Sequence, residues 1–74
     1  MTTVELKRRH KIVLENILEQ HREFNQMAAR WQKRTANGMG PGDEQFGKWL
    51  AERGKEIVEE TERELAYAKY LDSL

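Results

Sequence analysis

The residues that break helices are gathered in one short stretch of this chain, residues 35–43. It holds the only proline and three of the five glycines among 74 residues. Gly38 can adopt the left-handed conformation that closes a helix, Pro41 cannot continue one, and Asp43 can accept from the free amides that open the next. The stretch predicts a loop between two long helices, so the fold class is expected to be all-α, an antiparallel two-helix hairpin.

The first helix is expected to span residues 3–36. Thr2 and Glu5 have the spacing of a capping box, which places the helix start at about Thr3. Apolar side chains then return every three to four residues without interruption by glycine or proline, which indicates one continuous helical face. This face comprises Leu6, His10, Val13, Leu14, Ile17, His21, Phe24, Met27, Ala28 and Trp31. A helix of this length makes a rod of roughly 50 Å and needs a partner along it.

The second helix is expected to span residues 44–72, with Asp43 as its cap, and the loop to span residues 37–43 of a single domain, 1–74. Two apolar stripes run along it. The bulkier stripe comprises Phe46, Leu50, Ile57, Ala68 and Leu71, with Trp49 at its edge. The other has heptad-like spacing and comprises Gly47, Ala51, Gly54, Val58, Thr61, Leu65 and Ala68. Two stripes imply two neighbouring surfaces.

An antiparallel hairpin folded about the loop places residues side by side when their numbers sum to about 79. This register sets Trp31 near Trp49, and Phe24 near Gly54 and Ile57. It also sets Ile17 near Thr61 and Leu65, so it is apolar throughout, and it gathers the tryptophans into a cluster at the loop end of the core. The agreement between two independently identified stripes supports the hairpin.

The second stripe predicts self-association. Each helix-interior glycine costs roughly 1 kcal/mol relative to alanine, so Gly47 and Gly54 indicate the close approach of another helix. A chain this small without cysteine has neither disulfides nor thiolate metal sites to stabilise it, which favours oligomerisation. We therefore expect a homodimer forming a four-helix bundle. Its seam comprises Gly47, Ala51, Gly54, Val58 and Leu65.

The net charge is zero, from 13 basic and 13 acidic residues, so the whole molecule exerts no general attraction on nucleic acid. The first helix is the more basic and the second the more acidic, which favours their antiparallel pairing. No stretch approaches the apolar length of a membrane span, and the start lacks the pattern of a signal peptide. A soluble, cytoplasmic protein without membrane contact is therefore expected.

No residue set specifies a reaction, so no enzymatic activity, cofactor or metal is expected. A two-helix hairpin offers no concave wall for a catalytic site, and Ser73, the only serine, lies at the chain end. His10 and His21 are three turns apart, too far for one metal ion. Partly buried, hydrogen-bonded histidines are the expected alternative.

A basic cluster, residues 7–11, lies in the first turns of the first helix, where cations oppose the helix dipole. Together with nearby exposed hydrophobic residues, it has the arginine, aromatic and aliphatic character of a binding hot spot, and Ile12 and Tyr67 are expected to be neighbours across the hairpin. The predicted partner-binding residues are Arg8, Arg9, Lys11, Ile12, Tyr67 and Tyr70. A solvated charged face remains an equal alternative.

In outline the chain resembles the small helical hairpins that dimerise into four-helix bundles, such as plasmid copy-control RNA-binding proteins, and small phage accessory proteins that inhibit a host regulator. It also resembles the secreted WXG-type hairpins, but Trp31 is followed by Gln32 and Lys33, without the Trp-x-Gly turn. Two functions are expected. The first is a homodimeric adaptor, or an inhibitor or regulator of a larger protein, in the manner of a phage or mobile-element accessory protein. The alternative is an RNA- or DNA-binding regulator that uses the basic end.

Overall fold

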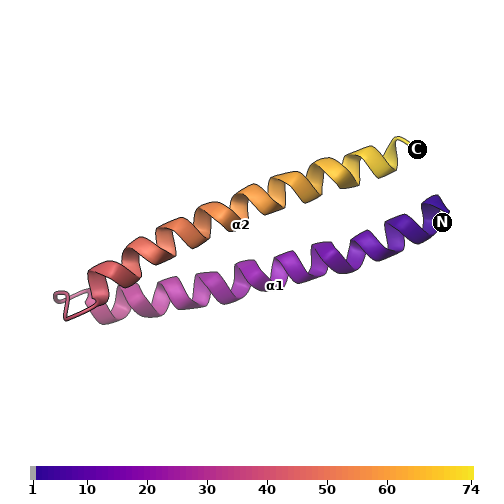
Figure 1. Cartoon of the computed structure of the whole chain (residues 1–74). Coiled ribbons are helices and arrows are strands. Elements are labelled where there is room, and N and C mark those ends of the chain that lie inside the picture. Colours follow the sequence, from indigo (N-terminus) through magenta and orange to yellow (C-terminus); the bar gives the residue numbers. More distant parts are fainter. Residues whose placement is uncertain (1) are drawn as a thin grey trace.

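The computed structural model describes residues 2–74 as a hairpin of two long helices (Figure 1). Helix α1 spans Thr3–Thr35 and helix α2 spans Asp43–Asp72. The helices run side by side in opposite directions, so the start of α1 and the end of α2 lie at the end of the rod away from the loop. The rod measures 54 × 15 × 15 Å. The predicted all-helical hairpin is confirmed.

Local chemistry sets the two helix starts differently. The Thr2 side chain accepts a hydrogen bond from the Glu5 amide at 3.2 Å, which confirms the predicted cap of α1. At α2, however, Gly42 is the capping residue, with a φ of 82° and no capping side chain. The predicted cap Asp43 is therefore wrong, because Asp43 is already the first residue of the helix.

The carboxylate of Asp43 instead fastens the loop. One oxygen accepts from the Gly40 amide at 2.7 Å, and the other accepts from the guanidinium of Arg34 at the end of α1. The backbone carbonyl of Asp43 accepts from the indole N–H of Trp31 at 3.0 Å. Asp43 is buried, and through these three contacts it connects the loop and both helices.

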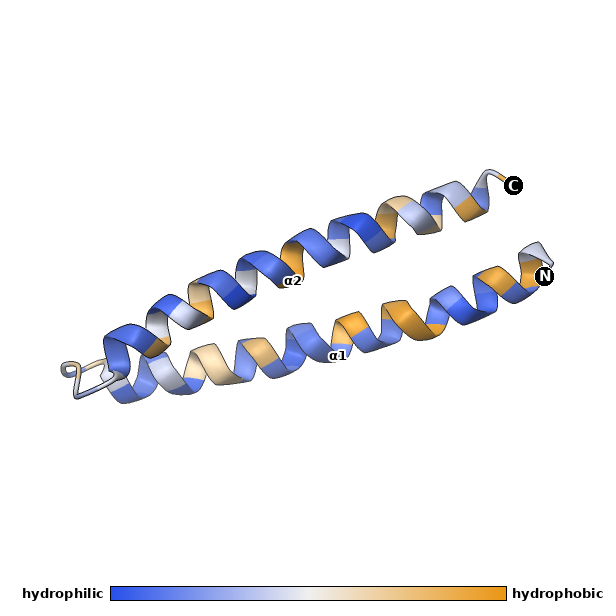
Figure 2. Ribbon diagram, in the orientation of Figure 1, coloured by the Kyte–Doolittle hydropathy of each residue, from blue (hydrophilic) through white to orange (hydrophobic). Residues whose placement is uncertain are grey.

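The core is a thin seam between α1 and α2. Four hydrophobic side chains are buried within residues 2–74: Ile17, Leu50, Ile57 and Leu71. Contacts across the seam follow the predicted register, since Lys7 pairs with Asp72 at 3.5 Å and the His21 ring bonds Thr61. Figure 2 shows that the hydrophobic positions of α1 gather in the half nearer the chain ends.

The two glycines of α2 lie beneath aromatic rings of α1. A Cβ atom at Gly47 would come within 2.7 Å of the Trp31 ring, and one at Gly54 within 3.0 Å of the Phe24 ring. The glycines thus do admit a close neighbour, but that neighbour is the partner helix of the same hairpin. Trp49 does not join Trp31 in the core; it stacks on Phe46 with ring centroids 5.5 Å apart and is 45% exposed.

Candidate protein-interaction surfaces

The seam between the helices leaves two long sides of the hairpin open to solvent. Each helix turns one row of residues directly toward its neighbour, and the rows that flank it face the two sides. One side is dominated by aliphatic residues, and we call it the aliphatic side. The other carries arginines beside aromatic rings, and we call it the aromatic side.

The aliphatic side contains an open groove of about 400 Å³ between α1 and α2. Its apolar lining is only partly covered, since Leu18 is 68% exposed and Leu65 is 55% exposed. Val58 lies seven residues before Leu65 on α2 and continues the same row, half exposed. The groove is lined by Leu14, Ile17, Leu18, His21, Thr61 and Leu65. No acidic or permanently charged side chain lines it.

The residues of the predicted dimer seam lie in two different environments. Ala51, Val58 and Leu65 are exposed on the aliphatic side and remain open to a second molecule. Gly47 and Gly54 are instead partly covered by Trp31 and Phe24 of the same chain. Leu18 also lines the groove but was not included in the predicted seam. Its position between Leu14 and His21 at helical spacing was the available signal.

Both histidines make hydrogen bonds within the hairpin. The Nε2 atom of His10, a residue only 6% exposed, lies 2.8 Å from a carboxylate oxygen of Glu64. The Nε2 atom of His21 lies 2.7 Å from the hydroxyl oxygen of Thr61. That hydroxyl donates its own proton to the Ile57 carbonyl, so the His21 nitrogen is the donor. Within residues 2–74, no three histidine, cysteine or carboxylate groups gather as around a metal ion.

The predicted partner-binding residues do not form one surface. Arg9 and Lys11 are two positions apart on α1, so they point about 200° apart around the helix. Lys11 lies on the aliphatic side, where it lines a small pocket with His10 and Leu71. The ring of Tyr67 contacts the ring of His10 edge-on, with centroids 4.9 Å apart, and is still 41% exposed.

Of the other members of the predicted patch, Tyr67 and Tyr70 lie together, whereas Ile12 lies apart from them. Ile12 follows His10 by two positions and is 57% exposed, so it lies on the far side of α1 from Tyr67. Tyr70 stacks on Tyr67 with ring centroids 6.1 Å apart. Arg8 is exposed and, within residues 2–74, forms no ion pair. This dispersal weakens the case for a single nucleic-acid surface at the basic end.

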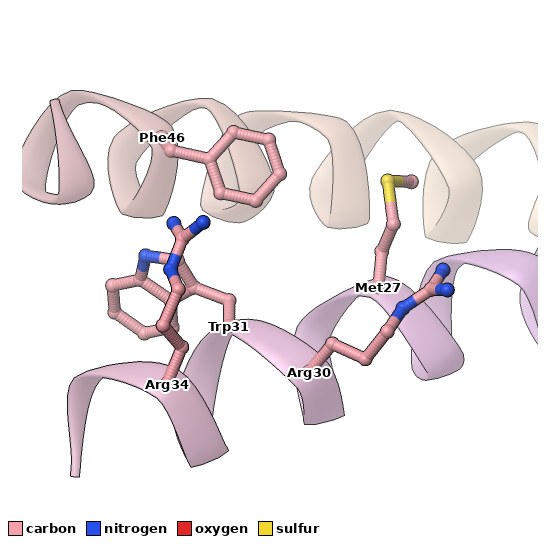
Figure 3. Close-up of a pocket in the computed structure, with 5 residues that line it drawn as sticks. All are labelled: Met27, Arg30, Trp31, Arg34 and Phe46. Carbon is pink, nitrogen blue, oxygen red and sulfur yellow. The ribbon is translucent and has the colours of Figure 1, made fainter.

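The aromatic side has an open pocket of about 400 Å³ near the loop (Figure 3). It is lined by Met27, Arg30, Trp31, Arg34 and Phe46. In Figure 3 the ring of Phe46 lies along α2 above Trp31, and both arginines extend from α1. Neither Arg30 nor Arg34 was singled out from the sequence as a binding residue. The pocket was missed because the rotation of each helix about its axis, which the register does not give, decides that Phe46 and these arginines share a side.

Neither helix of the described residues carries an apolar stretch long enough to cross a lipid bilayer. Comparison of the chain with protein-family models, with curated proteins and with solved structures finds no match. The functional inference therefore rests on the two surfaces.

Proposed function

We propose that the protein is a small, non-enzymatic interaction module that pairs with a second copy through its aliphatic side. Two hairpins joined in this way form a four-helix bundle, the common arrangement for helices whose apolar faces are too wide for one neighbour. The bundle presents the rest of its surface to a larger protein, for which it serves as an adaptor or regulator.

The observation that carries the proposal is the surface area of the single hairpin. A compact monomer of this mass exposes about 4,800 Å², from the usual scaling of surface with mass. The hairpin exposes 6030 Å². The surplus of about 1,200 Å² per chain is at least what each partner buries in a stable protein interface.

The residues of the aliphatic side are also suited to burial by a second copy. A symmetric dimer uses the same patch on both subunits, so the patch must complement itself. The groove has no acidic or permanently charged lining residue that would be repelled by its copy or left unpaired beneath it. Exposed Leu18 and Leu65 can each enter the opposite groove, and small Ala51, about four turns before Leu65 on α2, allows close approach nearer the loop.

Substitution in the groove tests the proposal. Leu18→Glu and Leu65→Glu place a carboxylate where the second copy would bury it, and an unpaired buried charge is strongly unfavourable. Each variant is expected to weaken self-association by at least about tenfold, or roughly 1.4 kcal/mol. Sedimentation velocity over a concentration series measures the change, and circular dichroism checks that the helices remain.

The matched control is Ile12→Glu, which changes an exposed aliphatic residue of α1 that lies away from the groove. This variant is expected to self-associate like the wild-type chain. Equal weakening by Ile12→Glu and Leu18→Glu would show a nonspecific effect of charge and contradict the assignment of the aliphatic side.

A further inference from the structure

The pocket on the aromatic side has walls that are fixed before any ligand arrives. The indole N–H of Trp31 is held by the Asp43 carbonyl at 3.0 Å, and its ring lies so close to Gly47 that a Cβ there would come within 2.7 Å of it. Phe46 is held from the other side by its stack on Trp49, at an interplanar angle of 22°. A ligand that binds these rings does not have to order them, which lowers the entropic cost of binding.

The same pocket carries positive charge that the hairpin does not neutralise. Arg30 is exposed and, among the residues described, has no acidic partner within ion-pair distance. Arg34 pairs with Asp43, yet its side chain remains 63% exposed and only part of its donor capacity is used. No acidic side chain lines the pocket. Arginine beside tryptophan is also the composition of binding hot spots.

From these features we propose that the pocket binds a short segment of a protein partner in which a carboxylate stands next to a bulky apolar side chain. The apolar group covers Met27 and Phe46, and the carboxylate accepts paired hydrogen bonds from Arg30. This assignment rests on the interaction role proposed above but requires no dimer, because the pocket and the aliphatic groove lie on opposite sides of the hairpin.

The surroundings of the pocket favour a peptide over a nucleic-acid strand. The next groove along the aromatic side is lined by both Glu23 and Arg53, and Arg53 is already paired with Glu56 at 3.3 Å. A phosphate backbone needs a continuous track of cations, which this alternation of charge interrupts. A short acidic segment needs only the one pocket.

Peptide selection tests the proposal and does not require an identified partner. The full chain is immobilised and a phage-displayed library of random dodecapeptides is selected on it. The selected peptides are expected to be enriched in Asp or Glu beside Leu, Phe or Trp. Selection without enrichment of acidic residues, or recovery of no binding peptide, would overturn the proposal.

Variants then locate the site, with the best selected peptide as the probe in fluorescence anisotropy. Arg30→Gln is expected to weaken its binding at least about tenfold, since the charge-assisted pair is lost, and Arg30→Lys to weaken it less. Arg63→Gln, which changes an exposed arginine of α2 outside the pocket, is the control and is expected to leave binding unchanged. Equal binding by wild type and Arg30→Gln would overturn the proposal.

Two further measurements separate this proposal from the alternatives. A labelled ten-residue oligo-dT is expected not to bind at the concentrations at which the peptide does; stronger binding of oligo-dT that is lost in Arg30→Gln would assign the pocket to nucleic acid instead. Sedimentation velocity on Arg30→Gln is expected to match the wild type. Peptide binding by a chain that stays monomeric would support the peptide site and refute the dimer. A dimer that binds no peptide would support the dimer and refute the peptide site.

Discussion

At the scale of single residues, alanine is expected to have different effects on stability at Gly47 and at Gly54. Both substitutions gain roughly 1 kcal/mol of helix propensity. The Trp31 ring over Gly47 is held by its hydrogen bond to Asp43, so it cannot move away from a new Cβ at 2.7 Å without losing that bond. We expect Gly47→Ala to destabilise the hairpin by about 1–3 kcal/mol, as overpacking does.

Gly54→Ala is the matched comparison. The Phe24 ring above Gly54 is 3.0 Å from the new Cβ, and no hydrogen bond restrains it. The helix propensity gained by alanine and the cost of crowding against the Phe24 ring should therefore nearly cancel. The free energy of unfolding is expected to stay within about 1 kcal/mol of the wild type. Thermal unfolding followed by circular dichroism measures both. Stabilisation of the two variants to the same degree would show that the Trp31 contact is not tight.

The two glycines also show how far single residues could be interpreted without the structure. Their cost in a helix correctly indicated a close neighbour. Their place in the second apolar stripe of α2 indicated contact with a second molecule. The two stripes of α2 are only one residue position apart, however, and the large rings of Phe24 and Trp31 on α1 extend over the glycines of the second stripe. A bulky residue at Gly54 would therefore disturb the hairpin before it disturbed a dimer.

At the scale of elements, Asp43 connects α1, the loop and α2. Asp43→Ala leaves the Gly40 amide without its partner and removes an anion from the first turn of α2. The pair with Arg34 adds less, because Arg34 is largely exposed. We expect a loss of about 2 kcal/mol in the free energy of unfolding, measured by urea denaturation.

Two further variants test which contacts of Asp43 cause this loss of stability. Asp43→Asn keeps an oxygen that can accept from the Gly40 amide but loses the charge, so it should fall between the wild type and Asp43→Ala. Glu44→Ala removes an exposed first-turn carboxylate with no role in the loop and should cost only a few tenths of a kcal/mol. If Glu44→Ala cost as much as Asp43→Ala, the effect would come from the helix dipole and not from the loop contacts.

The bounds of the elements were largely accessible from sequence. Periodicity and the loop residues placed α1 and α2 within one residue of their observed ends, because helix breakers and uninterrupted repeats act locally. The exchange of roles between Gly42 and Asp43 was not accessible. A capping aspartate and a first-turn aspartate have the same sequence signal, and only the positive φ of Gly42 separates them.

At the scale of the whole molecule, the register was predictable but the two sides were not. Residue numbers that sum to about 79 did identify neighbours such as Lys7 and Asp72. The sum leaves open which residues share a side, since this depends on the rotation of each helix about its axis. Arg9, Lys11 and Ile12 of the predicted patch therefore point in different directions around α1, and the groove around Leu18 emerged only when both rotations were known.

The shape of the particle in solution tests the central claim, pairing through the long aliphatic side, most directly. Small-angle X-ray scattering of the wild-type chain gives its mass and its maximum dimension together. Side-by-side pairing predicts twice the chain mass of 8.8 kDa with a length still close to the 54 Å of one hairpin. A mass that stays at 8.8 kDa at all concentrations, or a doubled mass with a length near that of two hairpins end to end, would contradict it.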